Sequence, residues 1–365
     1  MLERVVDWIR GAPRARLLQA VQIEVTSRCG SRCEMCPRTA MGAQWPETDM
    51  AWETFEGIGR VFPTAEHVHL QGWGEPLLHP RLFDMITRAK AGGCRVGLTT
   101  NGMGLGLDTA KTLVDLQLDL LSVSIAGATQ GTHERIRVGS DFSQILENVR
   151  QLLHLRSGGP SHGPKVELSY LMTRTNIAEL SQAVELASSL GVDELYATNL
   201  DYVVTPEHDR LRLFGCPDIR EEATRSVEEA RRRARRVGLA FRSYPLDLEE
   251  VTVCEAHPTK MLFVSCEGWV SPCTYLTLPR HTEVPRRFQG RQVSVPVVRF
   301  GNVRDRDVGE IWEGQSYRLF RQQFLRRETE AATRALVVAT GDASYEADLP
   351  DPPEPCLTCH KLYGV

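Results

Sequence analysis

The feature that most constrains this chain is a regular alternation of strand-like and helix-like stretches between residues 21 and 200. The six strand candidates are short, apolar runs: residues 21–26, 67–71, 95–99, 120–125, 165–172 and 194–197. Helical patterns lie between them, near residues 50–61, 80–91, 108–117, 142–156 and 177–190. Six consecutive βα units predict a parallel sheet. Because about 180 residues are too few for a complete eight-unit barrel, which takes ~250, we expect an α/β fold with a partial (β/α)6 TIM-like barrel.

The segments on either side of this alternation differ in pattern. Residues 1–20 predict a short amphipathic helix, and its charged residues exclude a secretory signal. We expect the barrel to span residues 21–245 and a C-terminal extension to span residues 246–365. Within the extension, residues 261–265 and 269–270 predict a β-hairpin, and residues 307–324 predict a helix. The stretch 326–355 is acidic, Ala-rich and finally Pro-rich, which predicts a mobile insertion.

Composition narrows the functional class. The chain has 42% hydrophobic and 25% charged residues, the proportions of a globular protein. Its 43 Lys and Arg against 47 Asp and Glu give a net charge of −4, which argues against a general nucleic-acid or membrane binder. No apolar run approaches the ~18–20 residues of a membrane span. We therefore expect a cytoplasmic protein with no nucleic-acid or membrane partner.

Ten cysteines are many for a chain without an export signal. Cys29, Cys33 and Cys36 form a C-x3-C-x2-C loop directly after the first expected strand. Three thiolates on so short a loop can hold a metal site, but a fully cysteine-ligated iron–sulfur cluster requires a fourth ligand. No nearby residue is an obvious fourth ligand for a structural zinc ion either. We therefore expect a coordination position that is left open for a small molecule.

Glycine-rich and polar segments follow the next three expected strands. They are Gly72-Trp73-Gly74-Glu75, Thr99-Thr100-Asn101-Gly102 and Ser122-Val123-Ser124-Ile125-Ala126-Gly127. The carboxyl ends of parallel strands meet at one edge of a barrel, where ligand sites form. Glycine at such positions lets a ligand approach the backbone closely. The sequence thus predicts one site shared by these segments and the cysteine loop.

Together these segments resemble the radical S-adenosylmethionine (SAM) superfamily, whose hallmark is the C-x3-C-x2-C loop. The resemblance implies that Cys29, Cys33 and Cys36 hold a [4Fe–4S] cluster and that SAM chelates its fourth iron. It implies the following SAM contacts: Met35 near the adenine, Gly72, Gly74 and Glu75 at the amine, Asn101 and Ser124 along the site, and Arg137 at the carboxylate. Trp73 replaces the middle glycine of the family motif, and Ala126 replaces its usual aspartate.

The remaining clustered cysteines form a second pattern. Cys254 is followed by Gly268 and Cys273, and much later by Cys356 and Cys359. This pattern is similar to the twitch extension, the shortened relative of the SPASM domain, and implies one auxiliary [4Fe–4S] cluster with four thiolate ligands. A four-thiolate zinc site and plain buried thiols are the alternatives.

Three cysteines stay outside both groups. Cys94, Cys216 and Cys266 are scattered in sequence, which argues against a second auxiliary cluster. We expect Cys94 to lie in the core. Cys266 is expected in the core of the hairpin, with a ligand role as the alternative. Cys216 follows the sixth strand, where a thiol could donate a hydrogen atom to a substrate.

The resemblance also implies a reaction. The reduced cluster passes one electron to SAM, which yields methionine and a 5′-deoxyadenosyl radical that abstracts a hydrogen atom from a substrate C–H bond. The auxiliary cluster then accepts the substrate electron, in a net oxidation. A small reductant protein such as flavodoxin or ferredoxin is implied as the electron source. A cluster-bearing electron-transfer or scaffold protein without catalysis is the alternative of a different class.

The substrate is narrowed only indirectly. Fewer than 25 residues precede the first expected strand, so we expect neither a cobalamin domain nor a fused peptide-recognition domain at the N-terminus. A small polar molecule is the leading expectation. A SPASM-type maturase that modifies a peptide or a partner metalloenzyme is the alternative. Asp201, Tyr202 and His208 follow the sixth strand and are candidate substrate contacts, together with Cys216.

Overall fold

The computed structural model describes residues 18–158, 163–279, 282–340 and 348–365. The expected N-terminal helix falls almost entirely on residues 1–17 and so lies outside the described residues. The helices are α2 (Pro37–Met41), α3 (Trp52–Gly59), α4 (Leu82–Ala91), α5 (Leu107–Asp115), α6 (Gln130–Ile136), α7 (Phe142–Gly158), α8 (Leu180–Leu190), α9 (Pro206–Leu211), α10 (Arg220–Val237), α11 (Val308–Trp312) and α12 (Gln315–Ala339). Among the helices of these four ranges, none combines the length and apolarity needed to cross a bilayer.

A parallel sheet forms the centre of the molecule. Its strands β1 to β6 occur in sequence order and follow the expected alternation: β1 (Leu18–Ile23), β2 (Ala65–Leu70), β3 (Arg95–Thr100), β4 (Leu120–Ile125), β5 (Lys165–Met172) and β6 (Glu194–Asn199). Adjacent members pair in parallel. The expected α/β fold with a partial barrel is confirmed. Strand β1 begins earlier than expected because Leu18 and Ala20 already pair with Ala65 and His67 of β2.

Further strands extend this sheet at both edges. Strand β7 (Ala240–Ser243) pairs in parallel with β6, and β8 (Met261–Val264) pairs in parallel with β1 on the opposite edge. Strands β9 (Trp269–Ser271) and β12 (Gly301–Asn302) continue in antiparallel fashion from β8. The predicted hairpin of residues 261–270 therefore exists, and it joins the C-terminal segment directly to the edge of the barrel sheet.

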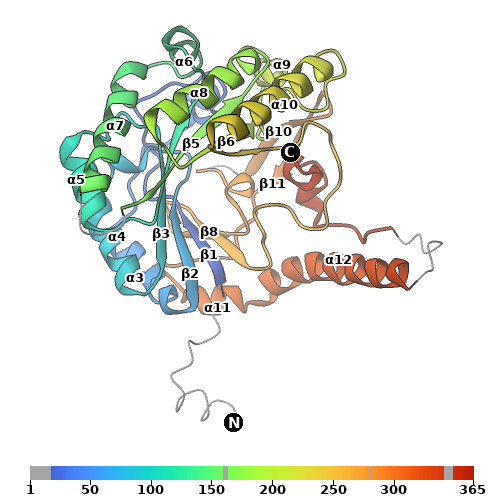
Figure 1. The fold of residues 1–365 in the computed structure, drawn as a ribbon. Coiled ribbons are helices and arrows are strands. Elements are labelled where there is room, and N and C mark those ends of the chain that lie inside the picture. The colour runs from blue at the N-terminus through green and yellow to red at the C-terminus, as the bar shows by residue number, and fades with distance from the viewer. Residues whose placement is uncertain (1–17, 159–162, 280–281, 341–347) are drawn as a thin grey trace.

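The two faces of the sheet differ in chemistry. Helices α3, α4, α5, α7, α8 and α10 lie on its outer face (Figure 1). Toward them the strands present buried apolar side chains such as Val68, Leu70 and Val123, which form the main core. The alternate side chains, which point inward, are mostly polar: Gln22, His69, Thr99, Ser122, Ser124, Glu167, Ser169, Tyr196 and Thr198. Period-two alternation along each strand thus separates a packed outer layer from a polar lumen.

The C-terminal region departs from expectation in two places. Residues 283–296, for which the sequence predicts no element, form an antiparallel hairpin of β10 (Glu283–Phe288) and β11 (Arg291–Pro296). The helix expected over 307–324 is split into α11 and α12, and α12 continues to Ala339, through the first part of the expected insertion 326–355. Figure 1 shows α12 running along one side of the molecule and away from the sheet. Alanine-rich sequence favours helix, which explains the extension.

Candidate functional site

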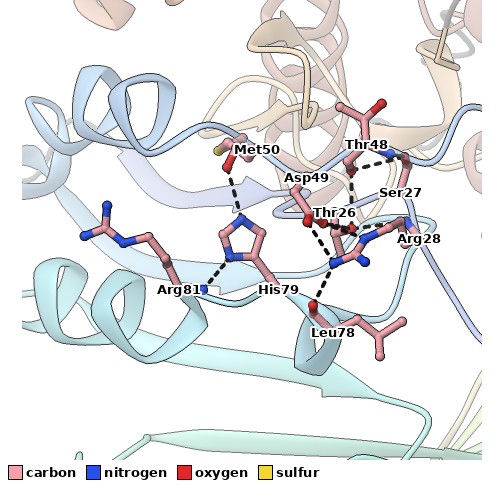
Figure 2. Close-up of polar contacts among 9 residues, drawn as sticks. All are labelled: Thr26, Ser27, Arg28, Thr48, Asp49, Met50, Leu78, His79 and Arg81. Carbon is pink, nitrogen blue, oxygen red and sulfur yellow. Dashed lines mark hydrogen bonds and ion pairs between the residues drawn. The ribbon is translucent and has the colours of Figure 1, made fainter.

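The first cysteine loop is held by a network at the end of β1. Arg28, which precedes Cys29, makes two hydrogen bonds to the carboxylate of Asp49, at 2.9 and 2.7 Å, and a third to the carbonyl of Leu78 at 2.9 Å. The hydroxyl of Thr26 donates to the same carboxylate at 2.7 Å. Figure 2 shows these contacts converging on Asp49. A bidentate Arg–carboxylate pair gives directional anchoring, so the start of the loop is fixed in position.

A second contact ties the neighbouring segments together. The Nε2 atom of His79 lies 3.0 Å from the carbonyl oxygen of Met50, and the backbone N–H of Arg81 donates to Nδ1 of His79 at 3.1 Å (Figure 2). Because His79 follows the short 3-10 turn Pro76–Leu78, this contact links the chain after Glu75 to the segment that carries Asp49.

The glycines of the Gly72-Trp73-Gly74-Glu75 segment are required by close approach. A Cβ atom at Gly74 would lie 2.1 Å from the carbonyl oxygen of Thr26, and one at Gly72 would lie 2.3 Å from Cγ of Glu24. The backbone N–H of Glu75 donates to the carbonyl of Arg28 at 2.7 Å. This segment therefore rests directly on the end of β1 and the start of the cysteine loop.

Glu75 is buried and its carboxylate accepts several hydrogen bonds. The hydroxyl of Thr100 donates to it at 2.7 Å, the backbone N–H of Asn101 at 2.7 Å and that of Leu77 at 3.1 Å. Burial, the largest effect, nevertheless raises the pKa of Glu75. The Asn101 side-chain amide in turn lies 3.8 Å from Sγ of Cys29. The ends of β2 and β3 are thus connected to the cysteine loop.

A cavity of about 550 Å³ opens at this edge of the sheet and continues into its lumen. Every residue predicted for the first site lines it: Cys29, Cys33, Met35, Cys36, Gly72, Gly74, Glu75, Asn101, Ser124 and Arg137. The Nε atom of Arg137 is buried and has no hydrogen-bond partner within the described parts of the chain. Burial raises the pKa of Cys36 to about 11. A guanidinium donor and thiols inside one cavity fit a bound cluster and an anionic group of a ligand.

The second cysteine group also comes together in space. Burial, the first cause, and the charge of Cys359, the second, raise the pKa values of Cys254, Cys273 and Cys356. Cys273 additionally lines the cavity. Within the described ranges, no three His, Cys, Asp or Glu side chains converge on one point where a single metal ion would sit.

Donors without partners surround these thiols. The buried hydroxyl oxygens of Thr274 and Thr358 and the Nε atom of Arg286 have no hydrogen-bond partner among residues that the structure describes. Thr274 follows Cys273, and Thr358 lies between Cys356 and Cys359. Sulfur atoms of iron–sulfur clusters accept hydrogen bonds, and buried donors normally have acceptors. The residues present therefore fit an iron–sulfur cluster at this position.

The candidate substrate contacts divide into two pairs. Asp201 and Tyr202 line the cavity. His208 is buried in α9 and Cys216 contacts the carbonyl of Arg212, and neither belongs to the cavity lining. Of the other cysteines, Cys94 is buried and its Sγ lies 3.2 Å from the carbonyl oxygen of Phe62. Cys266 is buried in the turn between β8 and β9, where its backbone N–H donates to Glu24.

Sequence reasoning missed much of the cavity wall. Lys361, two residues after Cys359, places its Nζ 2.7 Å from Oδ2 of Asp201 and 3.2 Å from Oε2 of Glu255. The hydroxyl of Tyr275 donates to Asp201 at 3.1 Å, and that of Tyr196 donates to Glu255 at 3.0 Å. Strands of a parallel sheet are normally apolar on both faces. The alternation of apolar and polar residues within β2, β4, β5 and β6 therefore indicates that one face of the sheet lines a polar cavity.

Two family profiles match the sequence. The profile described as Radical SAM superfamily matches residues 23–187. The SPASM profile, described as an iron–sulfur cluster-binding domain, matches residues 254–334. The first match begins at the last residue of β1 and covers the first cysteine loop and β2 to β5, and the second covers Cys254 and Cys273.

Curated relatives extend over most of the chain. A tungsten-containing aldehyde ferredoxin oxidoreductase cofactor-modifying protein of Pyrococcus furiosus is 29% identical over 83% of this chain and 83% of its own length. A PqqA peptide cyclase of Rhizobium meliloti is 24% identical over 88% of this chain and 80% of its own length. Both similarities include the C-terminal region as well as the barrel.

Solved structures agree in fold. Streptococcus suis SuiB, determined with bound S-adenosylmethionine, superposes with a TM-score of 0.63 and 14% sequence identity, over 86% of this chain and 69% of SuiB. At this level of identity the likeness supports the arrangement of the elements alone.

Proposed function

Because the chain belongs to the radical SAM superfamily and carries a SPASM-type iron–sulfur domain, we propose that it is a maturase that abstracts a hydrogen atom from a peptide or from a partner enzyme and its cofactor. Family membership brings two kinds of cofactor, SAM with its [4Fe–4S] cluster and auxiliary iron–sulfur clusters. The residues that hold them, the substrate and the net reaction belong to the proposal.

Cys29, Cys33 and Cys36 would hold the [4Fe–4S] cluster, and a cluster bound there would supply the electron needed to cleave SAM to methionine and a 5′-deoxyadenosyl radical. The protein orients SAM for this step. The unpartnered Nε–H of Arg137 binds the SAM carboxylate by a charge-assisted hydrogen bond, and Glu75 binds the amine. Met35, buried beside Ile136 and Ala126, provides an apolar wall for the adenine.

The observation that carries the proposal is the shared cavity. The three cysteines, the glycine segment, Asn101 and Ser124 come from the ends of four strands and line one space of about 550 Å³ together with Arg137, which follows helix α6. Ligand sites measure roughly 300–1,000 Å³, so this space has the size of a small-molecule site. Asp201, Tyr202 and Tyr275 line the same space and face the group to be modified.

Cys254, Cys273, Cys356 and Cys359 hold the auxiliary cluster in this proposal. Cys273 lines the cavity, so a cluster held by these thiols would border the substrate space and would supply an electron acceptor there. We place the boundary between the barrel and the C-terminal domain after residue 245. Strand β7, the edge strand beside β6, lies before this boundary, and Cys254, the first of the four auxiliary cysteines, lies after it.

The relatives change the order of the substrate candidates. A small polar molecule was the leading expectation from the sequence, and a maturase was the alternative. The relatives' names describe modification of an enzyme cofactor and cyclisation of a peptide, which favours the alternative. The polar lumen of the barrel is compatible with either kind of reacting group.

The enzymatic step is tested with SAM alone. Anaerobic protein, reconstituted with iron and sulfide and reduced with dithionite, is expected to release 5′-deoxyadenosine from SAM. A variant with Cys29, Cys33 and Cys36 changed to Ala is expected to release none, and Cys94→Ala serves as the matched control outside both cysteine groups. If the fully loaded, reduced protein releases no 5′-deoxyadenosine, the non-catalytic electron-transfer or scaffold function replaces this proposal.

The substrate class is tested by stimulation of SAM cleavage. An extract of cells that make the protein is divided by ultrafiltration into macromolecules and small molecules, and each fraction is added to the reduced enzyme with SAM. We expect the macromolecular fraction to raise 5′-deoxyadenosine formation above the level with buffer. If only the small-molecule fraction raises 5′-deoxyadenosine formation, the substrate is a small polar molecule and the maturase proposal is wrong.

A further inference from the structure

Arg286 is a buried cation that the proposed reaction does not use. It lies on β10, where it shares the inward face with Val284, and only 3% of its surface is exposed. It does not line the cavity, so it is not placed to bind SAM or a substrate. Burial of a charged group is costly unless an opposite charge or a full set of acceptors compensates it.

The guanidinium bridges the two cysteine segments of the C-terminal region. Its Nη1 atom donates to the carbonyl of Pro355, the residue before Cys356, at 3.1 Å. Its Nη2 atom donates to the carbonyl of Tyr275, two residues after Cys273, at 3.4 Å. Because these bonds fix both ends of the fork, the direction of the remaining Nε–H is also fixed.

The Nε–H has no acceptor in the structure. It is buried and finds no hydrogen-bond partner in the described ranges, and no described carboxylate lies within ion-pair distance of Arg286. Both of its acceptor carbonyls lie within two residues of a thiol of the second cysteine group, at Pro355 beside Cys356 and at Tyr275 after Cys273. The geometry therefore leaves both a donor and a positive charge uncompensated beside the second cysteine group.

We propose that Arg286 donates its Nε–H to a sulfur of the auxiliary iron–sulfur cluster and that its charge raises the reduction potential of that cluster. The inference rests on the proposed function, because it requires a cluster at Cys254, Cys273, Cys356 and Cys359. Such a cluster carries net negative charge, and hydrogen bonds to its sulfurs and the local charge set its potential. Arg286 is thus a positioning residue that tunes how readily the cluster accepts an electron.

The test isolates the auxiliary cluster in the full-length chain. Cys29, Cys33 and Cys36 are changed to Ala, so that iron bound after reconstitution reports the second site alone. In this parent protein, Arg286→Met removes the donor and the charge, and Arg286→Lys keeps a charge farther from the sulfurs. Arg287→Met is the matched control, because Arg287 is the next residue on β10 and contacts Asp209 and the carbonyl of Gly290 instead.

The measurements are iron content and the midpoint potential from redox titration followed by electron paramagnetic resonance. We expect Arg286→Met to bind iron as the parent does and to titrate at a more negative potential. Arg286→Lys is expected to fall between the two, and Arg287→Met to match the parent. A loaded Arg286→Met protein with the parent's potential, or an equal shift in Arg287→Met, would overturn the inference.

The test also gives a clear result if an Arg286 variant fails to bind iron. If Arg286→Met holds no iron, Arg286→Lys decides, and the parent's potential in that variant overturns the proposal. If neither Arg286 variant holds iron whereas Arg287→Met does, Arg286 is a structural clamp and the electronic role is rejected. If the parent itself holds no iron, the auxiliary cluster of the proposed function fails, which is a different result from failure at Arg286.

Discussion

At the scale of single residues, the site depends on buried groups whose charge is balanced by a few contacts. Glu75 illustrates this balance. Three donors reach its carboxylate, from Thr100, Leu77 and Asn101, yet burial still raises its pKa. Without a cationic ligand, ionisation of the buried Glu75 carboxyl group therefore costs free energy. A ligand with a positive group recovers that cost, which suits the amine and sulfonium of SAM.

Glu75→Gln tests this balance. Gln accepts from Thr100 and Leu77 but loses the bond from Asn101, while the cost of a buried charge disappears. We expect the free energy of unfolding to change by no more than about 1 kcal/mol. The loss of a charge-assisted contact is expected to weaken SAM binding about tenfold or more. Urea unfolding and equilibrium dialysis with SAM measure the two effects, and unchanged SAM affinity contradicts the assignment. Glu66→Gln, at an exposed position on β2, is the control.

His69 leads to a prediction about pH. Burial lowers its pKa to about 4 from 6.5, and its Nε2 lies 2.9 Å from the hydroxyl of Thr99. In the unfolded chain, His69 is protonated below about pH 6.5, whereas in the folded chain it is protonated only below about pH 4. The free energy of unfolding therefore falls as the pH is lowered from about 6.5 to about 4.

Between about pH 7 and pH 5 this one group is expected to remove about 2 kcal/mol of stability. His69→Gln should reduce the pH dependence of the unfolding free energy by that amount, measured by urea unfolding at both pH values. His154→Gln, on the exposed side of α7, is expected to leave the pH dependence unchanged. Equal pH dependence in wild type and His69→Gln would show that His69 protonates freely in the folded state.

How far residues can be predicted depends on how local their signal is. Cys29, Cys33, Cys36, Glu75 and Arg137 belong to short motifs, and the cavity brings them together. Lys361 and Tyr275 have no such motif, because their partner Asp201 is supplied by a distant part of the chain. Contacts of that kind follow from tertiary packing and cannot be deduced from spacing.

At the scale of elements, the barrel strands were predicted and the C-terminal elements only in part. Strands β2 to β6 coincide with the expected runs within a few residues, because short apolar runs bounded by turn signals specify buried strands. The hairpin β10–β11 was missed, since Pro285 and the arginines on either side of its turn mask the alternation. Its strands form a separate two-stranded sheet, an arrangement in which proline is tolerated.

Helix α12 is the clearest difference from expectation, and Arg327 anchors it to the rest of the molecule. This side chain is fully buried on α12, and it donates to the carbonyls of Thr252 at 3.0 Å, Val251 at 3.0 Å and Pro350 at 2.5 Å. It also pairs with Glu250 at 2.7 Å. The contacts anchor the helix within the segment expected to be mobile, and they connect it to the chain before Cys254.

Arg327→Met is expected to destabilise this region strongly. Three carbonyls and a carboxylate lose their buried donor together, at about 1 kcal/mol each, so we expect a loss of about 3 kcal/mol in the free energy of unfolding. Urea unfolding of the reconstituted protein measures it. Arg326→Met changes the exposed neighbour on the same helix and is expected to cost under about 0.5 kcal/mol. If both variants lose less than about 0.5 kcal/mol in the free energy of unfolding, Arg327 does not anchor the helix.

At the scale of the whole molecule, the cavity joins two parts of the chain that are far apart in sequence. Strand ends from β1 to β6 form one wall, and Cys273, Tyr275 and Lys361 form another. Strand β8 pairs with β1 and carries the hairpin into place, so the C-terminal region is built onto the edge of the barrel. The sequence predicts each part separately, but the shared wall depends on this pairing, which no local pattern encodes.

An ion pair between Asp201 and Lys361 links the two parts of the chain across this wall. Their atoms lie 2.7 Å apart, with side-chain exposures of 16% and 7%. Asp201 follows β6 of the barrel, while Lys361 lies in the segment that carries Cys356 and Cys359. Removal of one partner from a buried pair typically costs about 3–5 kcal/mol. Lys361 keeps its contact with Glu255 at 3.2 Å when Asp201 is changed, so we expect Asp201→Asn at the low end of this range.

We therefore expect Lys361→Met and Asp201→Asn each to destabilise the protein, and the double variant to lose clearly less than the sum of the two. The unfolding free energies of the four proteins form a double-mutant cycle, and a coupling energy above about 1.5 kcal/mol is expected because both charges disappear together in the double variant. Arg220→Met with Asp247→Asn provides a matched cycle at an exposed pair, where the coupling is expected to stay below about 1 kcal/mol. Equal coupling in the two cycles would mean that solvent screens Asp201 and Lys361 fully, and that the cavity wall is held by apolar packing alone.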